Sequence, residues 1–375
     1  MVFNSSRLRA ALFRVVLVMA VIVVPPVAGP LTATAAPSAP TSPVVASSPS
    51  ASPSPSPARR PEGGNEVACA CGCSVFDVGN IHGMVPARPS GGMVWFRYSY
   101  MDQNVNFRGS SRAPASLNGD RRLATSFFTF GGQYTLDSNW TLMGELPIFD
   151  RSLTTTDDGS VTGPAGSTYT ARTFALGDLK VMADYTGLSP DMTTGLTFGL
   201  KLPTGESTSA SGPLGGSYFD HDSLPGTGST DLMLGAYHIG DVADNMKIPY
   251  WVQASYSTAF ATTHQYRPGN ELDLALGIGY NFGPLVGTAT LPSLQLLGSF
   301  RNPDGGANAD PLNSGYSRLM LAPGVEFQFD RFRVYADVEY PIAQRVNAAS
   351  NVNIVGTTGQ LVAPVLYKVQ VGYEF

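Results

Sequence analysis

Three cysteines fall within one short stretch, Cys69-Ala70-Cys71-Gly72-Cys73, and they have the most distinctive chemistry in the chain. Side chains two residues apart lie on the same side of an extended backbone, so the thiolates could converge on a soft ion such as Cu(I) or Zn(II). His82 is close enough in sequence to supply a fourth ligand. The spacing lacks a Cys-x-x-Cys pair, and an oxidising compartment tends to join two thiols, so a locally disulfide-bonded, structural or plug-like segment is favoured over a metal site. We expect no cofactor other than such a metal ion.

The sequence contains no recognisable catalytic motif. It has no Gly-x-Ser-x-Gly, and none of its four histidines lies beside a serine in the context of a nucleophile elbow. His221 lies between Asp220 and Asp222, where a divalent cation could bind, but an exposed polar loop would have the same sequence. A formal net charge of -5 gives no indication of nucleic-acid binding. We therefore expect neither an enzyme nor a nucleic-acid-binding protein.

The segment 363–375, APVLYKVQVGYEF, has a strict two-residue period. One parity is apolar or aromatic throughout and ends on Phe375, whereas the other is mostly polar or small and includes Lys368 and Gln370. A strand presents alternate residues to opposite faces, so one face could meet lipid and the other water. A transmembrane strand needs about 9–11 residues, which this segment provides. It resembles the closing strand of a bacterial outer-membrane barrel, whose terminal Phe implies recognition by the outer-membrane assembly machinery.

The same period recurs from Met93 to the end and predicts twelve strands, an even number as single-chain bacterial barrels require. Long and short connections alternate, and the long ones are expected at 102–122, 149–174, 203–229, 260–270, 301–315 and 341–362. The fold class is therefore all-β, an antiparallel transmembrane β-barrel with outer-membrane lipid around it. Trp95, Trp140 and Trp251 begin strands on the short-turn side, as an interfacial belt would, although the alternation directs Trp95 and Trp251 inward.

Charged residues of both signs occupy the inward parity and are the candidate pore-lining residues. Charges at such positions must meet water or each other. They would form either a network that closes the barrel or the lining of a small pore. The set comprises Arg97, Glu145, Asp178, Lys180, Asp184, Lys201, Asp231, Glu271, Asp273, Arg318, Glu326, Arg333, Asp337 and Glu339.

The first 92 residues differ in composition from the rest of the chain. Arginines precede a short apolar run, Val15 to Val24, and a cleavage site of small residues follows the run. Residues 1–36 are therefore predicted to be a secretory signal peptide. Residues 37–66 are rich in Pro, Ser and Ala and are predicted to be a disordered linker. The Cys-rich segment, 67–92, is then expected in the periplasm, ahead of a barrel domain spanning 93–375 in the bacterial outer membrane.

Four segments also resemble one known family: 176–179 (LGDL), 195–205 (GLTFGLKLPTG), 224–231 (LPGTGSTD) and 266–270 (YRPGN). They are similar to the outer-membrane transporter-like family named for the phenol meta-cleavage degradation pathway. The resemblance covers about 93–375 and implies a barrel of twelve or so strands that passes small, apolar or aromatic solutes. Two alternatives stay open, namely a metal- or redox-linked barrel that uses the Cys-rich segment and a structural barrel without transport.

Overall fold

The computed structural model describes residues 91–137, 139–156, 166–208, 219, 221–242, 247–282, 284–285, 288–348 and 359–375. The predicted signal peptide, the linker and residues 67–90 of the Cys-rich segment lie outside these residues, as do Cys69, Cys71, Cys73 and His82. Gly91 and Gly92, which the prediction assigned to the Cys-rich segment, begin the first strand of the barrel. Their roles therefore stay predictions. No helix among the described residues is long and apolar enough to cross a membrane.

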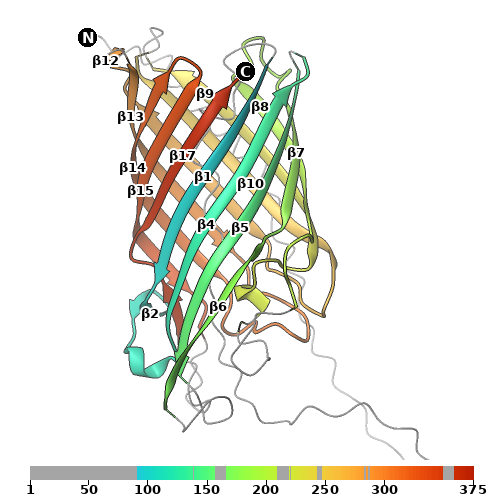
Figure 1. The fold of residues 1–375 in the computed structure, drawn as a ribbon, viewed down its shortest axis with the longest axis vertical. Helices are drawn as coiled ribbons and strands as arrows, with labels where there is room; N and C mark the ends of the chain where they lie inside the picture. Colours follow the sequence, from blue (N-terminus) through green and yellow to red (C-terminus); the bar gives the residue numbers. More distant parts are fainter. Residues whose placement is uncertain are drawn as a thin grey trace, which may run out of the picture. The chain divides into compact units, whose positions relative to one another are not determined.

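In the described part of the chain, twelve antiparallel strands form a closed barrel, as the sequence predicts (Figure 1). Pairing between β11 and β13 joins the two ends of the sheet. The wall strands are β1 (Gly91–Gln103), β4 (Asp120–Thr135), β5 (Trp140–Thr156), β7 (Leu179–Tyr185), β8 (Thr194–Leu202), β9 (Ser229–Asp241), β10 (Pro249–Thr262), β11 (Glu271–Gly279), β13 (Thr288–Arg301), β14 (Tyr316–Phe329), β15 (Phe332–Val346) and β17 (Leu366–Glu374).

The last strand closes the barrel against the first. β17 pairs with both β1 and β15, which places Lys368 beside Ser99 and Asp337. Tyr367 and Val369 on its outward parity are 46% and 43% exposed, whereas Lys368 between them is 2% exposed. These exposures confirm the predicted alternation of an apolar outer face with a polar inner face in this strand. The alternation arises because only the outer face needs to be compatible with lipid.

Two of the three tryptophans lie inside the barrel. Trp95 and Trp251 are buried, and each indole lies over the glycine paired with it on the neighbouring strand, Gly131 and Gly277 respectively. A Cβ at either glycine would come within 2.1 Å of the ring, so the missing side chain makes the space for it. The interfacial-belt expectation is therefore wrong for these two residues, whereas Trp140 faces outward.

The connection expected at 149–174 is a long hairpin and not a loop. β5 continues to Thr156 and pairs with β6 (Thr168–Leu176). β6 continues into β7 after Gly177 and Asp178, so the two strands together fill one place in the wall. The prediction failed because the sequence here loses its apolar alternation, and threonines such as Thr154 and Thr170 pair across the hairpin through their hydroxyls (3.0 Å).

Two other long connections also contain strands. β16 (Gln360–Val362), β2 (Val105–Arg108) and β3 (Ser111–Arg112) form a small sheet, followed by the short 3₁₀ turn η1 (Ala115–Leu117). Strands of two to four residues are too short for a two-residue period to reveal them. β2 and β6 lie at one end of the barrel, which we call the long-loop end (Figure 1). The C-terminus and β12 (Pro284–Leu285) lie at the opposite end, which we call the short-turn end.

Candidate binding site in the barrel lumen

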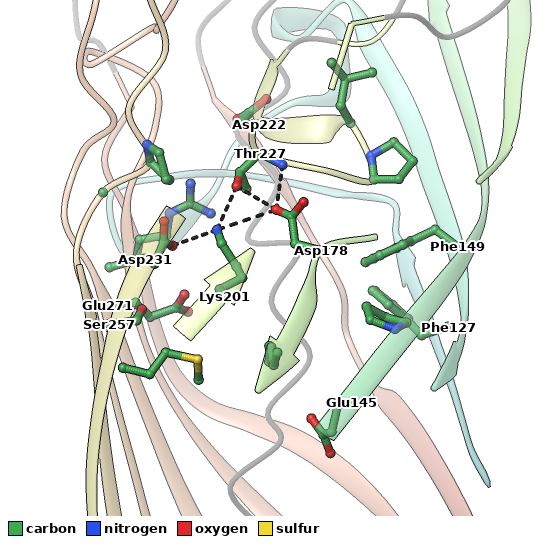
Figure 2. Close-up of a pocket in the computed structure, with 18 of the residues that line it drawn as sticks. Phe127, Glu145, Phe149, Asp178, Lys201, Asp222, Thr227, Asp231, Ser257 and Glu271 are labelled. Atoms are coloured by element: carbon green, nitrogen blue, oxygen red, sulfur yellow. Dashed lines mark hydrogen bonds and ion pairs between the residues drawn. The ribbon is translucent and has the colours of Figure 1, made fainter. Parts of the chain in front are cut away.

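A cavity of about 200 Å³ lies inside the barrel towards the long-loop end. Its wall comes from strands β4, β5, β7, β8, β9, β10, β11 and β13, and its cover from two loops, β8–β9 and β10–β11. Phe127 and Phe149 lie on one side of it, and Lys201, Asp231 and Glu271 lie on the other (Figure 2). The cavity thus has an aromatic side and a charged side.

The β8–β9 loop folds into the mouth of the barrel. It carries the 3₁₀ turn η2 (His221–Ser223), and Ser223 is fully buried. Leu224 and Phe219 join a buried apolar cluster that includes Leu123 and Leu153 on the wall. Burial of these side chains drives the loop inward.

His221 is accordingly not at an exposed loop tip. Its ring stacks on Tyr266, with 5.4 Å between the ring centroids and 17° between the planes. Among the described residues, no group of three or more His, Cys, Asp or Glu side chains is arranged to hold a metal ion. Asp220 lies outside the described residues. The contact with Tyr266 accounts for the position of His221 as part of the packing between the two loops.

Asp178 holds both ends of the β8–β9 loop. The backbone N–H of Gly205, where the loop begins, donates to Asp178 Oδ1 (3.0 Å). The backbone N–H and the hydroxyl of Thr227, where the loop ends, both donate to Asp178 Oδ2 (2.9 and 2.7 Å). Lys201 Nζ lies 2.6 Å from Asp231 Oδ2 and 3.7 Å from Asp178 Oδ2, and it donates to Thr227 Oγ1 (Figure 2). One buried carboxylate therefore clamps the loop, and Lys201 compensates its charge.

Glycines allow the two ends of the loop to meet. A Cβ on Gly226 would lie 2.4 Å from the carbonyl carbon of Gly205, and a Cβ on Gly205 would lie 2.7 Å from the Cα of Gly226. These are backbone atoms, so a side chain at either position displaces the loop and cannot be accommodated by a rotamer change.

We expect Gly226→Ala to loosen the loop without unfolding the barrel, because the clash lies in the loop and the wall strands keep their pairing. Limited proteolysis of the loop should be faster in this variant than in the wild type. Gly305→Ala is a matched control, since nothing lies within 4 Å of a Cβ at that loop glycine and its φ is not in the left-handed region. Equal proteolysis rates in Gly226→Ala and wild type would contradict the proposed role of this contact.

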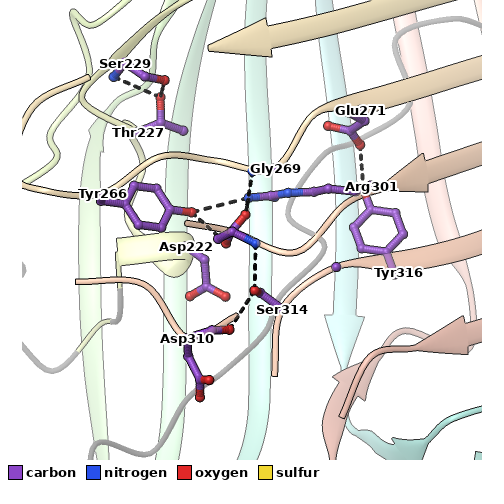
Figure 3. A network of polar contacts seen from close by, with 12 residues as sticks. Asp222, Thr227, Ser229, Tyr266, Gly269, Glu271, Arg301, Asp310, Ser314 and Tyr316 are labelled. Atoms are coloured by element: carbon purple, nitrogen blue, oxygen red, sulfur yellow. Dashed lines mark hydrogen bonds and ion pairs between the residues drawn. The ribbon is translucent and has the colours of Figure 1, made fainter. Parts of the chain in front are cut away.

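A second network supports the β10–β11 loop. Tyr266 donates to Asp304 Oδ2 (2.8 Å), and the backbone N–H of Gly269 and Arg301 Nη2 both donate to Asp304 Oδ1 (2.7 Å each) (Figure 3). Burial raises the pKa of Tyr266 well above its usual value, so the phenol stays protonated and remains a donor. On the wall beside it, Tyr316 donates to Glu271 Oε1 (2.6 Å).

Charge pairs and a chain of hydrogen bonds also link the strands elsewhere in the lumen. Lys368 Nζ donates to Glu339 Oε1 (2.7 Å), and both side chains are at most 2% exposed. Arg97 Nη2 lies 3.3 Å from Glu145 Oε1. A hydrogen-bonded chain from Trp251 through Gln295 and Tyr335 to Asp337 connects β10, β13 and β15. Arg333 contacts two carboxylates, those of Glu326 and Glu374.

The structure brings only part of the predicted lumen set into the cavity. The residues that line it are Glu145, Asp178, Lys180, Lys201, Asp231, Glu271 and Asp273. The remaining residues lie elsewhere on the barrel interior, namely Arg97, Asp184, Arg318, Glu326, Arg333, Asp337 and Glu339. Asp178 lies between β6 and β7, outside any strand, which frees its carboxylate to bind the loop.

Sequence reasoning missed the aromatic side of the cavity and Arg151. Phe149 and Arg151 continue the inward parity of Glu145 along β5, so extending that alternation by a few residues would have found them. No such signal existed for the loop residues Leu224 and Pro225, because their position depends on how the loop folds back.

No family model matches the chain, and no curated protein matches it either. Among solved structures, the chain is similar to the COG4313 outer membrane channel from Pseudomonas putida F1, with a TM-score of 0.55 and 13% identity over 77% of this chain and 97% of that one. Weaker similarities include the β domain of the Bordetella autotransporter BrkA (TM-score 0.45, 14% identity, 76% and 100% covered) and the CymD monoaromatic hydrocarbon channel (TM-score 0.39, 8% identity, 77% and 89% covered). The similarity to the COG4313 channel shows that the barrel has the fold of a bacterial outer-membrane channel.

Proposed function

We propose that the protein is a channel of the bacterial outer membrane that admits small solutes through the barrel lumen. The observation that carries the proposal is the cavity between the inserted β8–β9 loop and the wall. A barrel with a purely structural role has no need of a loop that is clamped at both ends over an internal cavity. The short-turn end and the Cys-rich segment would then face the periplasm, as in other outer-membrane barrels.

The lining suggests the class of solute. An aromatic side formed by Phe127 and Phe149 faces polar and charged groups such as Lys201 and Asp231. Binding pockets of this kind combine apolar walls with a few placed polar groups. A small solute with an apolar or aromatic body and a polar substituent satisfies both sides. The other charged residues on the barrel interior would line the rest of its path.

Membership of the phenol meta-cleavage transporter-like family is part of this proposal. Three of the four segments that carry the resemblance meet at the loop clamp, through Asp178, Lys201, Gly205, Thr227 and Asp231. Their joint role in holding the loop gives a physical reason for the three segments to occur together.

The proposal is tested by reconstituting the full-length protein in planar lipid bilayers. We expect discrete single-channel conductance, and concentration-dependent block by small aromatic solutes that enter the cavity. In a liposome-swelling assay, solutes with one aromatic ring should enter faster than larger solutes. A folded barrel that shows neither conductance nor swelling would instead indicate a structural barrel.

A further inference from the structure

Arg151 is a fully buried cation without an anionic partner in the described part of the chain. Its Nε donates to Thr125 Oγ1 (3.1 Å), and its Nη1 donates to the backbone carbonyls of Ser223 and Leu224. All of these acceptors are neutral. The guanidinium is 0% exposed, and its Nη2 has no hydrogen-bond partner among the residues that the structure describes. A buried charge with an unused donor is costly unless an anion compensates it.

The surroundings of Arg151 are aromatic and apolar. Its guanidinium carbon lies 5.1 Å from the centroid of the Phe149 ring. The Phe127 ring meets Phe149 edge-on, with 5.1 Å between centroids and 65° between planes. Leu224 and Pro225 from the loop line the same cavity. A ligand that meets Arg151 therefore also meets a surface suited to a flat ring.

The carboxylates that line the cavity already have partners. Asp178 and Asp231 contact Lys201, and Glu145 contacts Arg97. Glu271 accepts from Tyr316 and Ser299. These acids are therefore engaged on the wall, whereas Arg151 has one donor that no described residue uses and that an incoming acceptor could take.

We propose that Arg151 binds the carboxylate of a small aromatic acid whose ring packs against Phe149 and Phe127. This inference deepens and rests on the proposed channel function. Guanidinium–carboxylate hydrogen bonds are charge-assisted and stronger than neutral ones, so the acid is favoured over a neutral aromatic of the same size. A cavity of about 150 Å³ in another protein admits benzene, so a volume of about 200 Å³ is enough for one ring with a carboxylate.

The test is equilibrium dialysis of the detergent-solubilised full-length protein with radiolabelled benzoate. We expect saturable binding, with acetate and benzyl alcohol competing at least about tenfold less well, because each lacks one of the two recognition elements. Arg151→Gln should weaken benzoate binding at least about tenfold. Arg172→Gln is the matched control, since this exposed arginine lies on the adjacent strand β6, and it should leave binding unchanged.

Arg151→Lys covers the case in which the glutamine variant does not fold, since lysine keeps the charge and can donate to the loop carbonyls but loses the guanidinium fork. It should weaken benzoate binding severalfold. Phe149→Leu should weaken benzoate but not acetate. Equal benzoate binding by wild type and either Arg151 variant, or equal competition by benzyl alcohol, would overturn the proposal.

Conductance recorded on the same preparations separates this inference from the proposed function. Benzoate binding that depends on Arg151 in a barrel without conductance would support the site and contradict the channel. Conductance without benzoate binding would support the channel and contradict the site.

Discussion

Asp178→Ala is expected to raise the single-channel conductance severalfold, because it releases both ends of the β8–β9 loop at once. The substitution removes the acceptor for the Gly205 N–H and for the N–H and hydroxyl of Thr227. Each buried donor left without a partner costs about 1–3 kcal/mol. The inserted conformation loses this energy, whereas an open loop can satisfy the same donors with water. The equilibrium therefore shifts towards an open mouth.

The measurement is planar-bilayer conductance of full-length wild type and variant at equal protein and salt concentration. Asp150→Ala is the matched control, because Asp150 is an exposed carboxylate on the neighbouring strand β5 and should leave conductance unchanged. Heat-modifiable migration on a gel checks that each barrel is folded. Unchanged conductance in a folded Asp178→Ala barrel would show that this carboxylate does not hold the constriction.

Lys368→Met is expected to lower the free energy of unfolding of the barrel by about 3–5 kcal/mol, the usual cost of removing one partner of a buried ion pair. Lys368 and Glu339 are 2% and 0% exposed, and they lie 2.7 Å apart on the adjacent strands β17 and β15. Without the ammonium group, the Glu339 carboxylate stays in the interior with no compensating charge from Lys368. Replacing both residues, as Lys368→Met with Glu339→Leu, should recover most of the loss because no buried charge of the pair remains.

Urea-induced unfolding in phospholipid vesicles measures these differences. Lys247→Met is the control, since it removes an exposed ammonium group, and it should change stability by less than about 1 kcal/mol. A comparably small loss in Lys368→Met would contradict the proposed stabilising role of the pair. A double variant as unstable as the single one would indicate that side-chain packing, and not the uncompensated charge, causes the loss.

The sequence alone determined the barrel and the inward and outward faces of strands such as β1 and β17. The two-residue alternation in β17, for example, depends only on each residue and its immediate environment, lipid outside and lumen inside. The same alternation predicted that Trp95 and Trp251 point into the barrel, and the structure confirms this. The expectation that the two residues belong to an interfacial belt was wrong. Local patterns of this kind need no knowledge of which strands are neighbours.

Only the tertiary structure decided how the lumen is covered and where the cavity lies. The hydrogen bonds that clamp the β8–β9 loop join Asp178 to residues 27 and 49 positions away, and no local period encodes contacts over such distances. Arg151 likewise acquires its loop partners 72 and 73 residues further along the chain. A loop conformation depends on the burial of side chains such as Leu224 and on backbone hydrogen bonds to distant groups. These interactions exist only once the wall strands have brought the two ends of the loop together.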